Sequence, residues 1–128
     1  MRKEASRLWE QALEDLDTAK KLLEVEKYYA SVFFSEQAAE KALKTLFMER
    51  ERKIQFTHDL TELAENLNAP GDVYEAAAEL SPDYIITRYP NAANAVPAKL
   101  YTRKSAETHL KYGEEIIRWV AKELGLKI

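Results

Sequence analysis

Apolar residues recur at three- and four-residue steps through most of this sequence, a spacing that places them on one face of an α-helix. The stretch from Glu4 to Leu23 carries one such apolar stripe. The stretch from Tyr28 to Arg52 consists almost entirely of helix-forming residues and contains neither glycine nor proline. Because no alternating strand pattern competes with these segments, the sequence predicts an all-α protein.

Capping signals predict where two shorter helices begin. Asp59 is followed by Glu62, and Asp72 by Glu75, and both pairs have the spacing of a capping box. The first helix is expected to end at Pro70-Gly71, while the second should run to Leu80. These positions divide the middle of the chain into two helices joined by a tight turn.

The last part of the chain is expected to hold one short helix and one long helix. Ser81-Pro82 fits the cap and first turn of a short extension that reaches Thr87. Thr102 is placed to cap a long final helix that Gly125 ends. We therefore expect an antiparallel up-and-down bundle of four to five helices that forms a single domain over residues 1–128.

Composition limits the kinds of site that the chain can hold. Cysteine is absent and histidine occurs twice, so thiolate chemistry and cysteine-based zinc sites are excluded and no metal or cofactor is expected. The net charge is -3, so any nucleic-acid contact must use a local basic surface. No apolar run is long enough to cross a bilayer, and we expect a cytoplasmic protein. The excess of Glu and Lys over Asn and Gln is typical of thermophiles.

The predicted second helix has aromatic residues on two faces. A helical wheel places Phe34, Ala38, Ala42, Thr45 and Leu46 on the expected core face, with Ser31, Ala39 and Leu43 beside it. The opposite face combines three large aromatic residues with polar ones. Two explanations remain open: this face packs against another helix of the bundle, or it forms a homodimer interface. The residues of the proposed interface are Tyr29, Phe33 and Phe47.

A basic stretch interrupts the helical pattern near the end of the chain. The residues "TRYPNAANAVPAKLYTRK", 87–104, carry four positive charges and no negative one. Cations beside tyrosines suit a phosphate with an unstacked base. A second interpretation stays open: Arg88 pairs with a carboxylate such as Glu40, and Tyr89 closes the end of the bundle. The candidate nucleotide- or RNA-binding residues are Arg88, Tyr89, Lys99, Tyr101 and Lys104, with Lys41 and Lys44 as an extension.

Four segments in order resemble the HEPN domain family. They are "YYASVFFSEQAAEKALKTLF", "THDLTEL", "YIITRYP" and "LYTRKSAETHLKYGEEIIRWV". The resemblance implies a helical bundle that commonly dimerises and is often encoded beside a minimal nucleotidyltransferase, the two acting as a toxin-antitoxin pair. It also implies that many relatives are metal-independent ribonucleases. Their motif is an Arg and a His separated by four to six residues, assembled across a dimer cleft.

Two pairs in this chain have the motif spacing. Arg88 has no histidine at an allowed distance, but five residues separate Arg103 from His109 and Arg52 from His58. Six positions on a helix turn about 600°, so Arg103 and His109 should point about 120° apart. They can converge only if the helix starts late or if a dimer brings one residue from each chain together. For His58, a local hydrogen bond to backbone near the helix start is the expected alternative.

These observations favour a nucleotide- or RNA-contacting module, the non-catalytic partner of a nucleotidyltransferase. A ribonuclease that uses one of the Arg/His pairs across a homodimer is the alternative. A structural bundle that binds another protein through the aromatic face of its second helix is the third interpretation. The discriminating observation is whether an arginine and a histidine can reach one phosphate.

Overall fold

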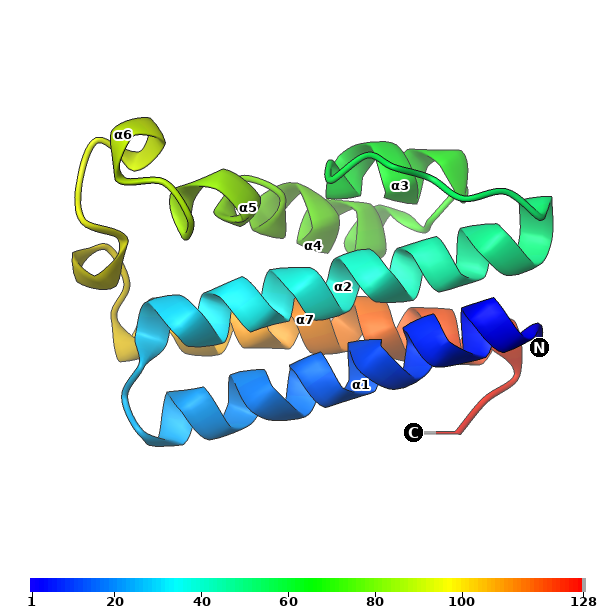
Figure 1. The fold of residues 1–128 in the computed structure, drawn as a ribbon, viewed down its shortest axis with the longest axis horizontal. Helices are drawn as coiled ribbons and strands as arrows, with labels where there is room; N and C mark the ends of the chain where they lie inside the picture. Colours follow the sequence, from blue (N-terminus) through cyan, green and yellow to red (C-terminus); the bar gives the residue numbers. More distant parts are fainter. Residues whose placement is uncertain (128) are drawn as a thin grey trace.

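The computed structural model describes residues 1–127 and has three long helices along one bundle axis. They are α1 (Lys3–Glu24), α2 (Tyr28–Glu51) and α7 (Arg103–Leu124). Figure 1 shows α1 running in the opposite direction to α2 and α7. The predicted all-α bundle is confirmed.

Shorter helices cover the other side of α2 and α7. They are α3 (Leu60–Asn66), α4 (Gly71–Leu80) and α5 (Asp83–Ile86), and Figure 1 shows α4 and α5 leading back along the bundle. The stretch predicted as a loop contains two more turns of helix, α6 (Pro90–Ala93) and the 3-10 helix η1 (Pro97–Lys99). Both begin at a proline, whose fixed φ suits a first helical position.

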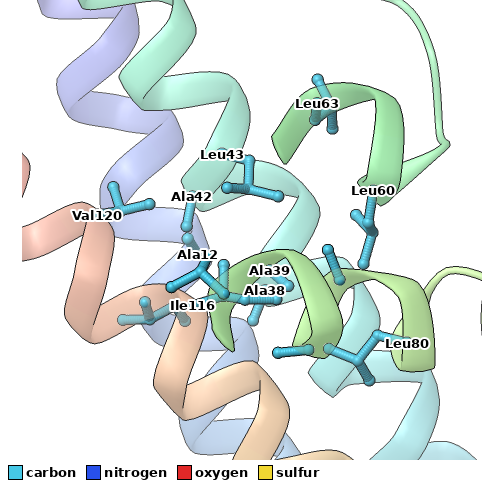
Figure 2. Packing of buried hydrophobic residues seen from close by; sticks show 14 of the residues in the cluster. Ala12, Ala38, Ala39, Ala42, Leu43, Leu60, Leu63, Leu80, Ile116 and Val120 are labelled. Atoms are coloured by element: carbon cyan, nitrogen blue, oxygen red, sulfur yellow. The ribbon is translucent and has the colours of Figure 1, made fainter. Parts of the chain in front are cut away.

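Alanines form the contact between α1 and α2. Ala12 and Ala19 of α1 and Ala38 and Ala42 of α2 are all fully buried. Figure 2 shows Ala12, Ala38 and Ala42 together in the core. Small side chains let the two helix backbones approach closely, and Ser31 uses this proximity, since its Oγ donates a hydrogen bond of 2.8 Å to the Ala19 carbonyl.

The central helix α2 is buried on most of its circumference, in line with the interpretation that its second face packs against other helices of the bundle. Phe34, expected in the core, is only half-buried, whereas Glu36 is 1% exposed. Helices α1, α7, α3 and α5 all pack against α2, so its surroundings are set by neighbours rather than by one apolar stripe.

The predicted boundaries of the last helix are confirmed. The Thr102 side chain accepts a hydrogen bond from the Ser105 backbone, and the Ser105 side chain accepts one from the Thr102 backbone, which together form a capping box. At the other end Gly125 has a φ of 72°, a left-handed conformation that favours glycine.

Two predicted caps were wrong. Helix α4 begins at Gly71 because Pro70, with a φ of -60°, leads directly into it, and Asp72 already lies inside the first turn. Ser81 does not cap α5. Its Oγ accepts a hydrogen bond of 3.0 Å from the Leu60 backbone and donates one of 3.1 Å to Asp59, so it supports the start of α3. Asp59 does cap α3, as predicted, by accepting from the Thr61 backbone.

Within residues 1–127, no helix has the length and apolar character needed to span a membrane.

Candidate functional site

The basic stretch 87–104 lies at one end of the bundle, and Figure 1 shows α6 at the same end as the start of α2. Lys99 and Lys104 are exposed and form no ion pair within residues 1–127. Tyr89 is 53% exposed and therefore does not close the bundle end, as one interpretation of the sequence expected. These three side chains are accessible to a ligand.

Arg88 belongs to a stack of rings rather than to an ion pair with Glu40. Its guanidinium carbon lies 4.5 Å from the ring centre of Phe33 and 4.4 Å from that of Tyr84. The Nε atom is buried without a hydrogen-bond partner among residues 1–127. The guanidinium thus connects α2 to the α5–α6 segment by cation-π contacts.

Glu36 is a buried carboxyl whose pKa is influenced by the charge of this guanidinium. Burial raises the pKa of Glu36 from 4.5 to about 8, and the negative charge of Glu40 adds to the shift. The Gln37 side chain, which donates a hydrogen bond of 2.8 Å to Oε1, and the charge of Arg88 act in the opposite direction. Glu36 is therefore protonated at neutral pH.

The two lysines expected to extend the basic surface are held by carboxylates. Lys41 forms a close ion pair with Asp15 of α1, which is 3% exposed. Lys44 lies 3.0 Å from Glu40, the i, i+4 pair that the sequence predicted. Because Glu40 is 6% exposed, this pair is buried on its acidic side rather than lying on the surface. The charges of both lysines are therefore matched within the chain.

His109 is bound to a buried carboxylate. Its Nδ1 is in hydrogen-bond contact with Asp83, which is 3% exposed, and the Tyr101 hydroxyl donates a hydrogen bond of 2.7 Å to the other oxygen of the same carboxylate. Burial and the bond to Asp83 raise the pKa of Tyr101. The Tyr101 hydroxyl is therefore committed to the protein interior rather than to the exposed basic surface.

Arg103 does not share the surroundings of His109. Its guanidinium lies 3.5 Å from Glu26 and 5.5 Å from the ring centre of Tyr28, at the turn between α1 and α2. The two members of this motif pair thus contact different parts of the chain, in line with their separation around the axis of α7.

His58 is held by α2 and not by local backbone, so the expected backbone contact was wrong. Its Nδ1 lies 3.1 Å from Oε2 of Glu40, and its ring stacks on Tyr84 with 4.2 Å between ring centres. Arg52, its motif partner, is exposed and ends α2 in a left-handed conformation. No hydrogen bond joins Arg52 to His58 within residues 1–127, since the hydrogen bonds of the His58 side chain go to Glu40.

Two of the three residues of the proposed dimer interface find partners inside the chain. Phe33 contacts Arg88 and packs edge-on against Phe34, with 5.0 Å between ring centres. Phe47 packs against the hydrophobic core. Tyr29 remains 37% exposed.

The sequence did not single out Asp83, Glu36 or Tyr84, which organise the site. Asp83 follows Ser81-Pro82 and looks like an ordinary first-turn acid, while Glu36 lies among polar residues of α2. The signal that could have indicated the burial of Glu36 was its position in the middle of α2, the central helix. Within residues 1–127, no group of three or more His, Asp or Glu side chains is arranged to hold a metal ion.

Comparisons with known proteins agree on one family. The family model described as the HEPN domain matches residues 5–124. The crystal structure of TT1696 from Thermus thermophilus superposes with a TM-score of 0.87 at 35% identity, covering 94% of this chain and 98% of that one.

Two further crystal structures have the same fold. ST0689, an archaeal HEPN homologue, gives a TM-score of 0.80 at 27% identity over 96% of this chain and 98% of its own. An HEPN domain protein from Thermotoga maritima, TM0613, gives a TM-score of 0.75 at 29% identity. The match covers 93% of this chain and 98% of that one. Among curated proteins, none matches. With the family model spanning nearly all of its helices, this chain belongs to the HEPN domain family.

Proposed function

We propose that this HEPN domain contacts nucleotide or RNA through its 87–104 segment and does not cleave it. The observation that carries the proposal is the charge of this segment. Between Tyr84 and Ala106 the sequence has no acidic residue, and the exposed Lys99 and Lys104 are unmatched by carboxylates within residues 1–127. Such cations attract phosphates at low cost, because no internal ion pair must be broken first.

The exposed ring of Tyr89 supports contact with a single strand. It lies at the start of α6, one residue after Arg88, whose cation-π contacts fix the backbone at this point. An anchored backbone that presents an open aromatic ring can stack an unpaired base, while nearby lysines contact the phosphates.

The test is the affinity for a labelled single-stranded RNA, measured by fluorescence anisotropy at several salt concentrations. The variant Lys99→Ala/Lys104→Ala should bind more weakly, and its plot of log K against log salt should be shallower by about 1.4, or about 0.7 for each lost phosphate contact. The control Lys3→Ala/Lys122→Ala removes the same charge from exposed positions in other parts of the chain. Equal affinities for both variants would contradict the proposal.

The same proposal includes a homodimer and a nucleotidyltransferase partner, as the family resemblance implies. The exposed Tyr29 on α2 supports a contact there, although Phe33 and Phe47 already have neighbours in the chain. Sedimentation equilibrium of wild type and Tyr29→Glu measures the first part. Copurification with a co-expressed minimal nucleotidyltransferase tests whether the two proteins bind each other, as the members of a toxin-antitoxin pair would.

A metal-independent ribonuclease is the second candidate, and the Asp83–His109 contact favours it. A buried carboxylate on Nδ1 fixes the tautomer and orientation of an imidazole, which is what a general base requires. The arginine would have to come from a second copy, because Arg103 lies with Glu26 and Tyr28 in its own chain.

Cleavage of a structured RNA without added metal separates the two candidates. If the domain is a nuclease, His109→Ala should abolish cleavage, and Asp83→Asn should reduce it by several orders of magnitude. His58→Ala tests the other pair in the same assay, and Arg103→Ala mixed with His109→Ala tests complementation across a dimer. Absence of cleavage by the wild type, together with salt-dependent RNA binding, is the result we expect.

A further inference from the structure

Four side chains form a continuous stack that ends at the surface in His58. The Arg88 guanidinium lies over the rings of both Phe33 and Tyr84, and His58 lies nearly parallel to Tyr84, with 11° between the ring planes. Arg88 and His58 therefore both lie against the Tyr84 ring, at 4.4 Å and 4.2 Å from its centre. The side chain of His58 is 49% exposed, so the stack has an open end.

The open end of the stack is held rigidly. Nδ1 of His58 lies 3.2 Å and 3.1 Å from the two oxygens of Glu40, whose side chain is 7% exposed. Lys44 contacts the same carboxylate and balances its charge. An aromatic ring fixed on one edge by a buried carboxylate and on one face by Tyr84 is preorganised for stacking, because little side-chain entropy remains to be lost.

A surface pocket of about 520 Å³ opens beside this ring. Ligand pockets typically have volumes of a few hundred Å³ or more, and they combine apolar walls with a small number of polar groups. This pocket has that composition, since hydroxyls and one carboxylate accompany apolar and aromatic side chains. Its lining consists of His58, Asp59, Thr61, Ala78, Ser81, Pro82, Tyr84 and Ile85.

Asp59 gives the pocket its chemical selectivity. One oxygen, Oδ1, accepts from the Thr61 backbone, the Thr61 hydroxyl and the Ser81 hydroxyl, so Oδ2 is the oxygen that can accept a donor from a ligand. The hydrogen bonds from Thr61 and then Ser81 hold the pKa of Asp59 below its ordinary value, so the carboxylate carries no proton to donate. A ligand edge that presents only donors complements it.

We propose that this pocket binds a guanine base, stacked against His58 with its N1–H and 2-amino group directed at Asp59. Guanine is the base that presents two adjacent donors on one edge, whereas the corresponding edges of adenine and cytosine pair a donor with an acceptor. The N3–H of uracil lies between two carbonyl oxygens that an ionised carboxylate repels. The inference goes beyond the RNA contact proposed above, since the site lies outside residues 87–104 and requires no phosphate.

Binding of free nucleosides, followed by chemical shifts of backbone amides in the wild-type protein, tests the site. Guanosine should bind with shifts centred on residues 58–61 and 78–85, inosine should bind about fivefold more weakly because it lacks the 2-amino group, and uridine should not bind. Wild-type protein that shows no guanosine shifts near the solubility limit, or that treats guanosine and uridine alike, would overturn the assignment.

Three variants locate the interactions. His58→Ala should weaken guanosine binding by about tenfold, whereas His58→Phe keeps an aromatic face and should stay within about threefold. Asp59→Asn, which retains a good helix cap, should abolish the preference for guanosine over inosine. If guanosine binds His58→Ala and Asp59→Asn as well as it binds wild type, the pocket is not the site.

The nucleoside experiment tests the pocket separately from the proposed RNA contact. The nucleosides carry no phosphate, so they do not report on Lys99 or Lys104. Guanosine binding combined with unaltered RNA affinity in Lys99→Ala/Lys104→Ala would support the pocket and refute the basic segment, and the opposite result would do the reverse.

Discussion

The contact between α1 and α2 and the junction of α2 with α5 and α7 bury side chains in opposite ways. At the first contact, fully buried alanines from both helices meet, and Ser31 adds one hydrogen bond to the Ala19 carbonyl. At the second, the buried groups are carboxyls: Glu36, Glu40 and Asp83 are each at most 6% exposed.

The difference shows where stability and chemistry reside in this domain. The alanines gain from dispersion and from removal of apolar surface from water, and the ion pair of Asp15 with Lys41, which also joins α1 to α2, is already matched within the chain. The polar junction buries ionisable groups, which costs desolvation free energy, and its contacts hold His58, Arg88 and His109 in defined positions. Four substitutions test this difference through their effects on the stability of the folded protein.

The largest effect is expected in the apolar core. Leu43 is fully buried on α2, so Leu43→Ala should lower the free energy of unfolding by about 2–5 kcal/mol, through lost transfer free energy and the cavity left behind. Urea denaturation measures this change. Leu43→Met conserves volume and should cost less than about 1.5 kcal/mol. A small effect of the alanine variant would mean that the core collapses around the missing side chain.

The junction should show a pH dependence that the alanine contact lacks. Glu36 keeps its proton in the folded state up to a pKa of about 8, whereas in the unfolded chain it ionises near 4.5. Between these values the folded state binds more protons, so the free energy of unfolding falls as pH rises, by up to about 1.4 kcal/mol per pH unit. Glu36→Gln removes this contribution and should gain stability relative to wild type as pH rises.

Urea denaturation of both proteins at several pH values within that window checks the prediction. Glu107→Gln, at an exposed position of α7, removes the same charge and serves as the control. Parallel pH profiles for wild type and Glu36→Gln would show that Glu36 ionises normally in the folded protein.

Removing one hydroxyl tests the Asp83 cluster. Tyr101→Phe leaves this buried carboxylate without one of its donors, and we expect a loss of about 1–3 kcal/mol in the free energy of unfolding. The resonance of the His109 ring should shift as well, because Asp83 then interacts with the imidazole alone. Tyr112→Phe is the matched control, since the Tyr112 ring also lies against His109 but its hydroxyl makes no hydrogen bond within residues 1–127.

The smallest expected effect lies outside both regions, at the start of α7. Thr102→Ala removes the capping box and should cost about 1 kcal/mol, whereas Thr102→Ser keeps the cap oxygen and should be close to neutral. A thermal melt of the three proteins gives the comparison. If the alanine variant melts together with wild type, the contacts of the basic segment hold this end of α7 without its cap.

The helices could be predicted from the sequence because their causes are local. Apolar spacing predicted α1 and α7, and Thr102 and Gly125 marked the ends of α7 through side-chain and backbone preferences that do not depend on the rest of the fold. The position of α2 at the centre could not be predicted in this way. Its burial depends on four other helices, and a helical wheel, which has no information on these neighbours, assigned Phe34 to the core.

The candidate site was harder to predict because its contacts join distant segments. Glu40 and His58 are 18 residues apart, and Asp83 and His109 are 26 apart. The spacing of the sequence motif paired Arg103 with His109. The residue that positions His109 is instead Asp83 of α5. The exposed cations Lys99 and Lys104 were recognisable, because an absence of acidic neighbours is visible in the sequence itself.

The hydroxyl of Ser81, which holds the start of α3 from the end of α4, also bears on how the chain folds. A helix of seven residues does not persist alone in water, because its nucleation cost is spread over too few hydrogen bonds. Asp59 caps α3 locally, but the Leu60 amide finds its acceptor on a residue 21 positions later, so the first turn of α3 is completed by the end of α4. The two helices should therefore open as one cooperative unit, with equal hydrogen-exchange protection at Leu60 and in α4.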